Sequence, residues 1–168
     1  MHEKSIELLN KAVADELSAV HQYMYFHFHC DDQGLDLLAN LFKRTAIEEM
    51  LHIERLAERI LFLKGEVEMA ASEPAQKLHK VKQMLEVASK METESALAHN
   101  KWANECSANA DSMSKKLFEE LVMDEERHFD QYDTEMDHLN DYGDNYLALQ
   151  SIERSKRTGT AGGPSATT

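Results

Sequence analysis

Most of this sequence repeats apolar residues at steps of three and four and contains very few residues that break a helix. The 168 residues include only six Gly and two Pro, and three of these Gly and one of the Pro fall within the last ten positions. Steps of three and four place side chains on one face of an α-helix, whereas Gly and Pro are the residues that destabilise helices most. The pattern therefore predicts an all-α fold built from long amphipathic helices.

The apolar periodicity predicts four long helices and a short fifth one. They cover about residues 6–30, 38–64, 74–102, 112–140 and 144–155. Short loops make the first two helices antiparallel neighbours, and likewise the third and fourth, whereas Gly65–Pro74 is predicted to be a long crossover. We therefore expect an antiparallel four-helix bundle with its long crossover between helices two and three. Phe28 and Phe129 belong to the apolar stripes that are predicted to face inward.

The composition argues against several classes of partner. A formal net charge of −13 makes nucleic acid an unsuitable partner, because phosphate binding requires clustered Lys and Arg. No apolar run approaches the roughly 18 residues that a membrane helix needs, and no secretory signal is visible at the N-terminus. The two cysteines, Cys30 and Cys106, cannot form a disulfide framework and fit a reducing cytoplasm. We expect both to be buried and unpaired.

Six polar side chains interrupt the apolar faces of the four long helices. Two Glu-x-x-His pairs each place a carboxylate and an imidazole on one helical face, and one further Glu interrupts each of the other two helices. A buried carboxylate without a partner is costly, whereas four carboxylates and two imidazoles can together hold two metal ions. The predicted ligands of this di-iron site are Glu16, Glu49, His52, Glu92, Glu125 and His128.

The spacing of these residues is more specific than the Glu-x-x-His motif, which also occurs at Glu135–His138 and is there expected to face solvent. Glu16 and Glu49 are 33 residues apart, and so are Glu92 and Glu125. The two halves of the chain thus repeat one pattern at a distance of 76 residues. A symmetric pair of metal ions requires such a pseudo-two-fold arrangement of ligands.

Geometry suggests a role for each ligand. The Glu of each Glu-x-x-His pair is predicted to bridge both irons, each His to bind one iron, and the remaining two Glu to be terminal ligands. This set leaves open positions at which dioxygen or peroxide can bind. Tyr23 lies two helical turns after Glu16 on the same face. Its role stays open between a partner of the site, by hydrogen bonding or electron transfer, and a core tyrosine.

The sequence resembles bacterioferritins over residues 5–155. The stretches that carry the resemblance are Leu9–Tyr23, Ile47–Gly65, Asp124–Asp130 and, in the predicted fifth helix, Asn145–Ile152. The ligand positions of that family fall on the same six residues. The resemblance implies a hollow homo-oligomeric shell of 24 subunits that oxidises Fe(II) with oxygen or hydrogen peroxide and stores a ferric mineral. Such a protein is a cytoplasmic ferroxidase with a di-iron centre.

Bacterioferritins also bind haem b between two subunits, and the resemblance places Met50 at the axial-ligand position. Met50 lies about 100° around the helix from Glu49, which directs it outward onto a neighbouring subunit. Three nearby residues, Asp31, Gln33 and Leu51, depart from the family pattern around the haem. The sequence therefore leaves haem binding open.

Two related functions remain as alternatives. A di-iron peroxidase of the rubrerythrin type uses a similar bundle but usually carries a Cys-x-x-Cys iron domain, which has no counterpart here. A 12-subunit shell of the starvation-protein type lacks the fifth helix. We assign residues 1–155 to one ferritin-like domain, and we expect the Gly-, Ser- and Thr-rich residues 156–168 to be disordered.

Overall fold

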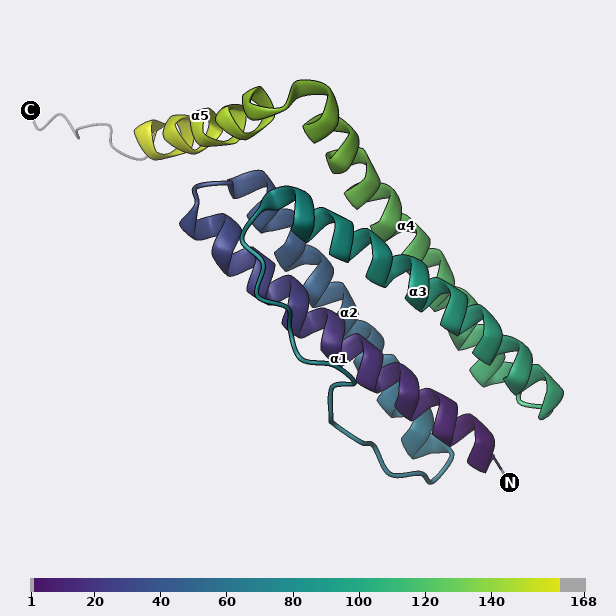
Figure 1. The fold of residues 1–168 in the computed structure, drawn as a ribbon. Helices are drawn as coiled ribbons and strands as arrows, with labels where there is room; N and C mark the ends of the chain where they lie inside the picture. Colours follow the sequence, from purple (N-terminus) through teal and green to yellow (C-terminus); the bar gives the residue numbers. More distant parts are fainter. Residues whose placement is uncertain (1, 161–168) are drawn as a thin grey trace, which may run out of the picture.

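The computed structural model describes residues 2–160 and contains five helices within them. They are α1 (Glu3–Asp32), α2 (Asp36–Phe62), α3 (Val81–Ala108), α4 (Ser112–Tyr142) and α5 (Asp144–Thr160). The first four run side by side as a long bundle, and α5 turns away from the end of α4 (Figure 1). The predicted all-α bundle with a short fifth helix is confirmed. None of the described helices combines the length and the apolar character that crossing a bilayer requires.

The bundle consists of two helical hairpins joined by one long connection. Residues 33–35 link α1 to α2, and residues 109–111 link α3 to α4. The first of these turns contains Gly34, whose φ of +77° is a conformation that glycine adopts without strain. The crossover, residues 63–80, returns along the outside of α1 from the end of α2 to the start of α3 (Figure 1).

The crossover is longer than predicted, because residues 74–80 are not helical and α3 begins at Val81. Side chains of α1 form hydrogen bonds with backbone groups of this segment. The amide of Gln22 donates to the carbonyl of Gln76 and accepts from its N–H, and the hydroxyl of Ser18 accepts from the N–H of Glu73. These tertiary hydrogen bonds hold the segment extended along α1. At its other end α3 continues to Ala108 rather than stopping near Trp102.

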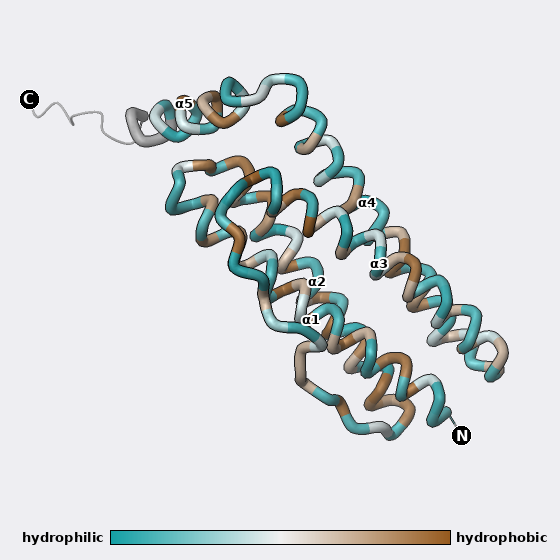
Figure 2. Tube along the Cα trace, viewed as in Figure 1, coloured by the Kyte–Doolittle hydropathy of each residue, from teal (hydrophilic) through white to brown (hydrophobic). Residues whose placement is uncertain are grey.

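The apolar core forms two clusters, one toward each end of the bundle. One contains Phe26, Phe42 and Leu85, and the other contains Leu56 and Phe118. Hydrophobic and hydrophilic residues alternate along each helix in Figure 2, as amphipathic helices require. The six predicted ligands fall between the sequence positions of the two clusters on all four helices. A polar layer thus crosses an otherwise apolar bundle at its middle.

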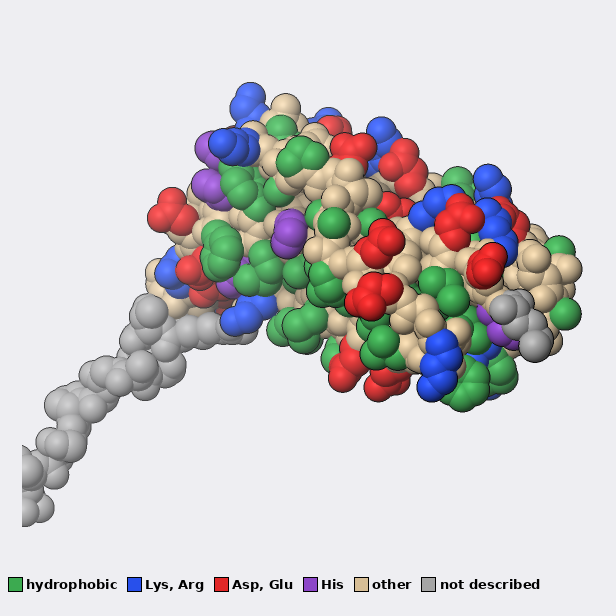
Figure 3. Space-filling model, turned by 90° about the horizontal axis from the view of Figure 1, so that it is seen from below, with side chains coloured by type: hydrophobic (Ala, Val, Ile, Leu, Met, Phe, Trp, Pro, Cys, Tyr) green, Lys and Arg blue, Asp and Glu red, His purple; other side chains and the backbone are tan. Residues whose placement is uncertain are grey.

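Two predictions about inward-facing residues are wrong. Phe28 is 60 % exposed and Phe129 is 37 % exposed. Phe26 and Cys30 fill the inward positions at the end of α1, and a residue between them points about 160–200° away. Tyr132 similarly takes the inward position after Phe129. Exposed hydrophobic side chains also lie between acidic and basic groups on the face of the molecule shown in Figure 3.

The remaining predictions concern the two cysteines, the third Glu-x-x-His pair and the C-terminal tail. Cys30 and Cys106 are fully buried and form no disulfide, as expected. Glu135 and His138 lie 3.9 Å apart with partly exposed side chains, as predicted for a solvent-facing pair. Helix α5 continues to Thr160, beyond the predicted end of the fifth helix at residue 155, and disorder of the tail stays a prediction. Residues 161–168 lie outside the described part of the chain.

Candidate metal centre

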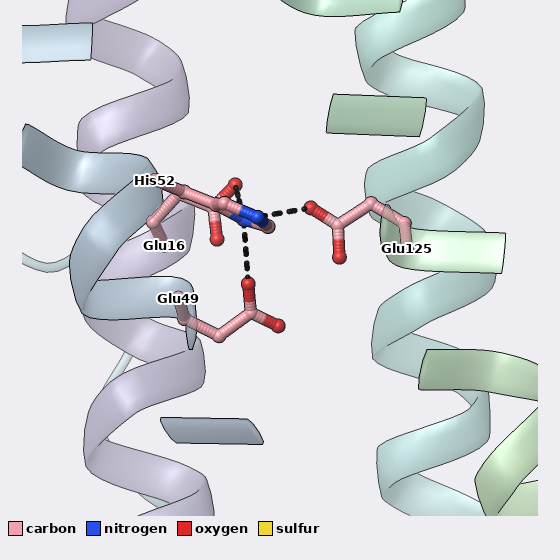
Figure 4. A group of neighbouring side chains, drawn as sticks. All are labelled: Glu16, Glu49, His52 and Glu125. Atoms are coloured by element: carbon pink, nitrogen blue, oxygen red, sulfur yellow. Dashed lines mark ion pairs between the residues drawn. The ribbon is translucent and has the colours of Figure 1, made fainter. Parts of the chain in front are cut away.

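The six predicted ligands converge in the polar layer at the middle of the bundle. Each is at most 3 % exposed. Helix α1 supplies one carboxylate, α3 supplies another, and α2 and α4 each supply a Glu-x-x-His pair. Figure 4 shows part of this cluster, with side chains from α1, α2 and α4 directed toward one another. The cluster comprises Glu16, Glu49, His52, Glu92, Glu125 and His128.

One half of the cluster surrounds Nδ1 of His52. This nitrogen lies 2.8 Å from Oε2 of Glu49, 3.5 Å from Oε1 of Glu125 and 3.6 Å from Oε1 of Glu16 (Figure 4). Four donor atoms from three helices therefore face one small volume. Ligand atoms of these four residues lie within 4.8 Å of one another, which is close enough for all of them to bind one ion.

The other half of the cluster surrounds Nδ1 of His128 in the same way. This nitrogen lies 3.2 Å from Oε1 of Glu49, 3.5 Å from Oε2 of Glu125 and 3.5 Å from Oε2 of Glu92. Glu49 and Glu125 therefore present one carboxylate oxygen to each imidazole. These are the two residues predicted to bridge both irons, and the arrangement places them between the two groups.

The donor atoms fit two divalent cations. Several of them are buried and lack a hydrogen bond of acceptable geometry: Oε1 of Glu16, Oε2 of Glu49, Nδ1 of His52, Oε1 of Glu125 and Nδ1 of His128. Leaving so many buried polar atoms without hydrogen bonds costs free energy. Two divalent ions would bind them and would neutralise the four carboxylates, with mainly oxygen donors and one nitrogen from the Glu-x-x-His pair on each side. Such a set suits Fe(II).

Burial and mutual contact shift the pKa of most groups in the cluster. Burial raises the pKa of Glu16 and of Glu92 well above the usual range. Burial opposes protonation of His52 and His128, but the surrounding carboxylates outweigh it and raise the pKa of both imidazoles. For Glu125 burial is again outweighed, and contact with the imidazoles lowers its pKa. Without metal, protons therefore neutralise part of the carboxylate charge.

Behind each imidazole lies a carboxylate that the sequence analysis did not identify. Glu48 lies 2.8 Å from Nε2 of His128, and Asp124 lies 3.2 Å from Nε2 of His52. Arg127 donates hydrogen bonds to both carboxylates. Glu48 and Asp124 are themselves 76 residues apart, so the internal repeat carried a signal for this second pair. Such contacts fix which ring nitrogen faces the metal.

Tyr23 is a partner of the cluster, as one of its two predicted roles requires. Its hydroxyl donates a 2.5 Å hydrogen bond to Oε1 of Glu92, while the other oxygen of that carboxylate faces His128. Tyr132 lies beside it, with the two ring centroids 5.5 Å apart, and the hydroxyl of Tyr132 has no hydrogen-bond partner. Burial raises the pKa of both phenols. The two rings therefore remain neutral.

A seventh polar residue, His99 of α3, also reaches the cluster and was not predicted. It is 1 % exposed and lies 3.6 Å from Glu16 and from Glu125. Burial lowers its pKa to about 4. The sequence could have predicted this residue from the internal repeat. His99 follows Glu92 by seven residues, just as Tyr23 follows Glu16.

Met50 lies outside this cluster. Its side chain is 52 % exposed on α2, next to Leu51, which is 46 % exposed, and one turn from Ile47, which is 44 % exposed. Met50 thus points outward, as its position beside Glu49 predicted. Two of its neighbours on α2 are thus exposed apolar side chains.

Comparison with known proteins gives a consistent result. The ferritin-like domain family matches residues 6–141. A bacterioferritin of Desulfovibrio desulfuricans is 36 % identical over 158 residues, which cover 94 % of this chain and 88 % of the relative. A bacterioferritin of Brucella melitensis biotype 1 is 36 % identical over 141 residues, covering 84 % of this chain and 88 % of the relative.

A solved structure resembles the fold closely. The X-ray structure of the Desulfovibrio desulfuricans bacterioferritin superposes with a TM-score of 0.86 at 35 % identity, covering 88 % of this chain and 86 % of that chain. That structure describes the di-iron site of the relative after reduction in solution and reoxidation before crystallisation.

Proposed function

The chain belongs to the bacterioferritin family of ferritin-like proteins, and we propose that six buried side chains hold its di-iron centre. It is an iron-storage ferroxidase, which oxidises Fe(II) to Fe(III) at that centre. The proposed ligands are Glu16, Glu49, His52, Glu92, Glu125 and His128. The observation that supports this assignment most strongly is the set of buried oxygen and nitrogen atoms that face one another without hydrogen bonds.

Each side chain has a defined part in this reaction. A bound iron pair supplies redox chemistry, in which electrons pass from Fe(II) to oxygen or hydrogen peroxide. Glu49 and Glu125 hold the two positions together, because each offers one oxygen to either side. His52 and His128 orient their Nδ1 atoms toward the pocket, with Nε2 directed at a carboxylate. The apolar clusters at both ends of the bundle exclude bulk water.

The chain is a homo-oligomer, and we propose that the oligomer is a hollow shell of 24 subunits. Several large apolar side chains of residues 2–156 lie exposed on a single subunit, including Phe28, Leu61, Phe62 and Leu97. Contact with neighbouring subunits would remove such groups from water. Helix α5 supports the 24-subunit form over a 12-subunit shell. In this proposal residues 1–155 form the iron-binding domain.

We extend the proposal to a haem between two subunits, with Met50 as its axial ligand. The exposed thioether of Met50 and its apolar neighbours Ile47 and Leu51 suit the apolar face of such a group. Replacement of Met50 by Leu would keep the apolar surface and remove the sulfur. Loss of a haem absorption band in Met50→Leu supports the assignment, and an unchanged band contradicts it.

We also propose that the protein works in the cytoplasm. Both of its cysteines are buried and unpaired, which fits a reducing compartment. Burial raises the pKa of Cys30 to about 12 and also raises that of Cys106. The thiols are therefore protonated and unreactive.

The test is aerobic addition of Fe(II) to the purified metal-free protein, followed by ferric absorbance and then by sizing of the product. We expect rapid oxidation and iron that co-elutes with a shell of 24 subunits. Glu49→Ala and Glu125→Ala should each abolish the rapid phase. Glu54→Ala, which alters an exposed carboxylate on α2, is the matched control and should oxidise iron as the parent does.

The outcomes separate the alternatives. Oxidation that saturates near two irons on a small oligomer would indicate a di-iron peroxidase of the rubrerythrin type. Mineral in a shell half as large would indicate the 12-subunit form. No oxidation above the protein-free rate would contradict the assignment of the centre.

A further inference from the structure

The buried imidazole of His99 has no partner that explains its position. It is 1 % exposed, and neither Nδ1 nor Nε2 makes a hydrogen bond. On one side its ring packs against Trp102 and Phe118, with centroids 5.6 Å away in both cases. A buried polar side chain without a hydrogen bond costs free energy. A binding partner for the ring nitrogens of His99 would compensate for this cost, and only the other side of the ring leaves room for one.

That other side is the metal pocket. Nε2 of His99 lies 3.6 Å from Oε1 of Glu16, and Nδ1 lies 3.6 Å from Oε1 of Glu125. The same two oxygens lie 3.6 Å and 3.5 Å from Nδ1 of His52. Two imidazoles from different helices thus face one pair of carboxylate oxygens.

The other half of the site has no imidazole in the equivalent place. Residues 76 apart correspond in the two halves, and the residue that corresponds to His99 is Tyr23. Tyr23 contacts Oε1 of Glu92, whereas Oε2 of that carboxylate faces Nδ1 of His128. Tyr23 therefore lies behind its carboxylate. His99 instead contacts the oxygen of Glu16 that faces the pocket.

We propose that His99 is a seventh metal ligand, which binds through a ring nitrogen at the position formed by Glu16 and His52. The proposal rests on the di-iron centre assigned above. Two atoms bound to one ion at about 2.1 Å and at right angles lie about 3 Å apart, so an approach from 3.6 Å requires a shift of less than about 1 Å. A neutral imidazole always offers one nitrogen lone pair for such a bond.

The consequence is that the two metal positions differ. The position of His52 would have two nitrogen donors and the position of His128 would have one. Imidazole favours Co²⁺, Zn²⁺ and Fe²⁺ over Mg²⁺ and Mn²⁺. The nitrogen-rich position should therefore fill first and hold these ions more tightly.

Anaerobic titration of the metal-free assembly with Co²⁺ tests the proposal without any turnover. Calorimetry gives the affinity of each position, and the visible absorption of Co²⁺ reports its nitrogen ligands. The variants are His99→Leu, which removes all polar atoms, and His99→Gln, which keeps a hydrogen-bond donor but is a poor ligand. His21→Gln, an exposed histidine on α1, is the matched control.

We expect both His99 variants to weaken one of the two Co²⁺ positions by about tenfold or more, to shift its absorption and to leave the other position unchanged. Parental affinity and spectrum in His99→Gln would overturn the proposal, because they would indicate a hydrogen-bonding role only. Parental behaviour in both variants would reduce His99 to a packing residue. Failure of the parent itself to bind two Co²⁺ ions would overturn the di-iron centre as well.

Discussion

The carboxylate of Glu48 lies 2.8 Å from Nε2 of His128, on the opposite side of the ring from the metal pocket. A carboxylate only accepts hydrogen bonds, so this contact keeps a proton on Nε2 and makes Nδ1 the ring nitrogen that a metal ion can bind. Burial opposes ionisation of Glu48, but Arg127 and His128 outweigh it and lower its pKa. Glu48 and Arg127, which lie outside the pocket, therefore orient the imidazole of His128.

Replacement of Glu48 should weaken metal binding without touching a ligand. In Glu48→Ala the ring of His128 loses the acceptor that fixes its tautomer, and we expect affinity at that position to fall about 10- to 100-fold. Competition with a fluorescent chelator for Zn²⁺ measures it. Glu54→Ala, on an exposed face of the same helix, should retain the parental affinity, and equal affinities of the two variants would refute the orienting role.

The metal-free protein should become more stable when one terminal carboxyl is removed. Burial raises the pKa of Glu16, which reflects the cost of keeping a carboxylate away from water. Glu16→Gln should therefore stabilise the metal-free protein by about 1 kcal/mol, which is about 2–4 °C in melting temperature. The same variant should gain less than the parent when Zn²⁺ is added. Melting curves with and without EDTA compare them, and a lower metal-free melting temperature would contradict the argument.

The hydroxyl of Tyr23 should stabilise the bundle through Glu92. Tyr23→Phe leaves Oε1 of that carboxyl group without its 2.5 Å donor, so we expect a loss of about 1–3 kcal/mol. Thermal unfolding of the metal-free protein measures it. Tyr25→Phe, which removes a hydrogen bond to the exposed His79, serves as control and should cost less than about 1 kcal/mol. Equal losses would argue against a special role of Tyr23.

A pH-dependent contribution to stability is expected from Asp111, the N-cap of α4. It accepts hydrogen bonds from Ser114 and from Arg59, and its carboxyl group is 3 % exposed. Burial opposes ionisation, but these contacts lower its pKa to about 2. Because the folded pKa lies below the unfolded value of about 4, the contribution is complete above pH 4 and is lost as the pH falls toward 2.

Asp111→Asn should thus cost about 2 kcal/mol at pH 7, and the difference from the parent should narrow between pH 4 and pH 2. Thermal melting across this range measures it, with Asp32→Asn at an exposed site as control. A gap between parent and variant that stays constant with pH would show that the lost contact is not electrostatic.

The sequence predicted the helices and the six ligands because both depend on local periodicity and on a repeat. Glu16 and Glu92 stand out only because apolar residues surround them on every helical turn. The crossover was predicted too short, since Pro74 is a good first residue of a helix. The bonds from Gln22 that hold Gln76 extended connect segments far apart in the chain and leave no local pattern.

Residues that act behind the ligands were harder to find. Asp124 and Glu48 look like ordinary surface carboxylates, because charged residues follow or precede most ligands in this acidic chain. His99 occupies a core position where a histidine is commonly a satisfied polar residue, and only the packing of α3 against α1 and α4 brings it within 3.6 Å of two carboxylates. The outward direction of Phe28 depends on which of two adjacent helical faces meets a partner, which periodicity alone does not determine.

The arrangement of the bundle as two hairpins also bears on its behaviour after proteolysis. Helix α1 packs chiefly on α2, and α3 chiefly on α4, with less extensive packing between the pairs. The polar layer contributes ligands from both hairpins to each metal position. Bound metal therefore adds a cross-link to the apolar clusters and ion pairs that already join the two hairpins. A cut in the crossover near Met69, an exposed residue, should leave a nicked protein whose two fragments separate at a lower denaturant concentration when a chelator removes the metal.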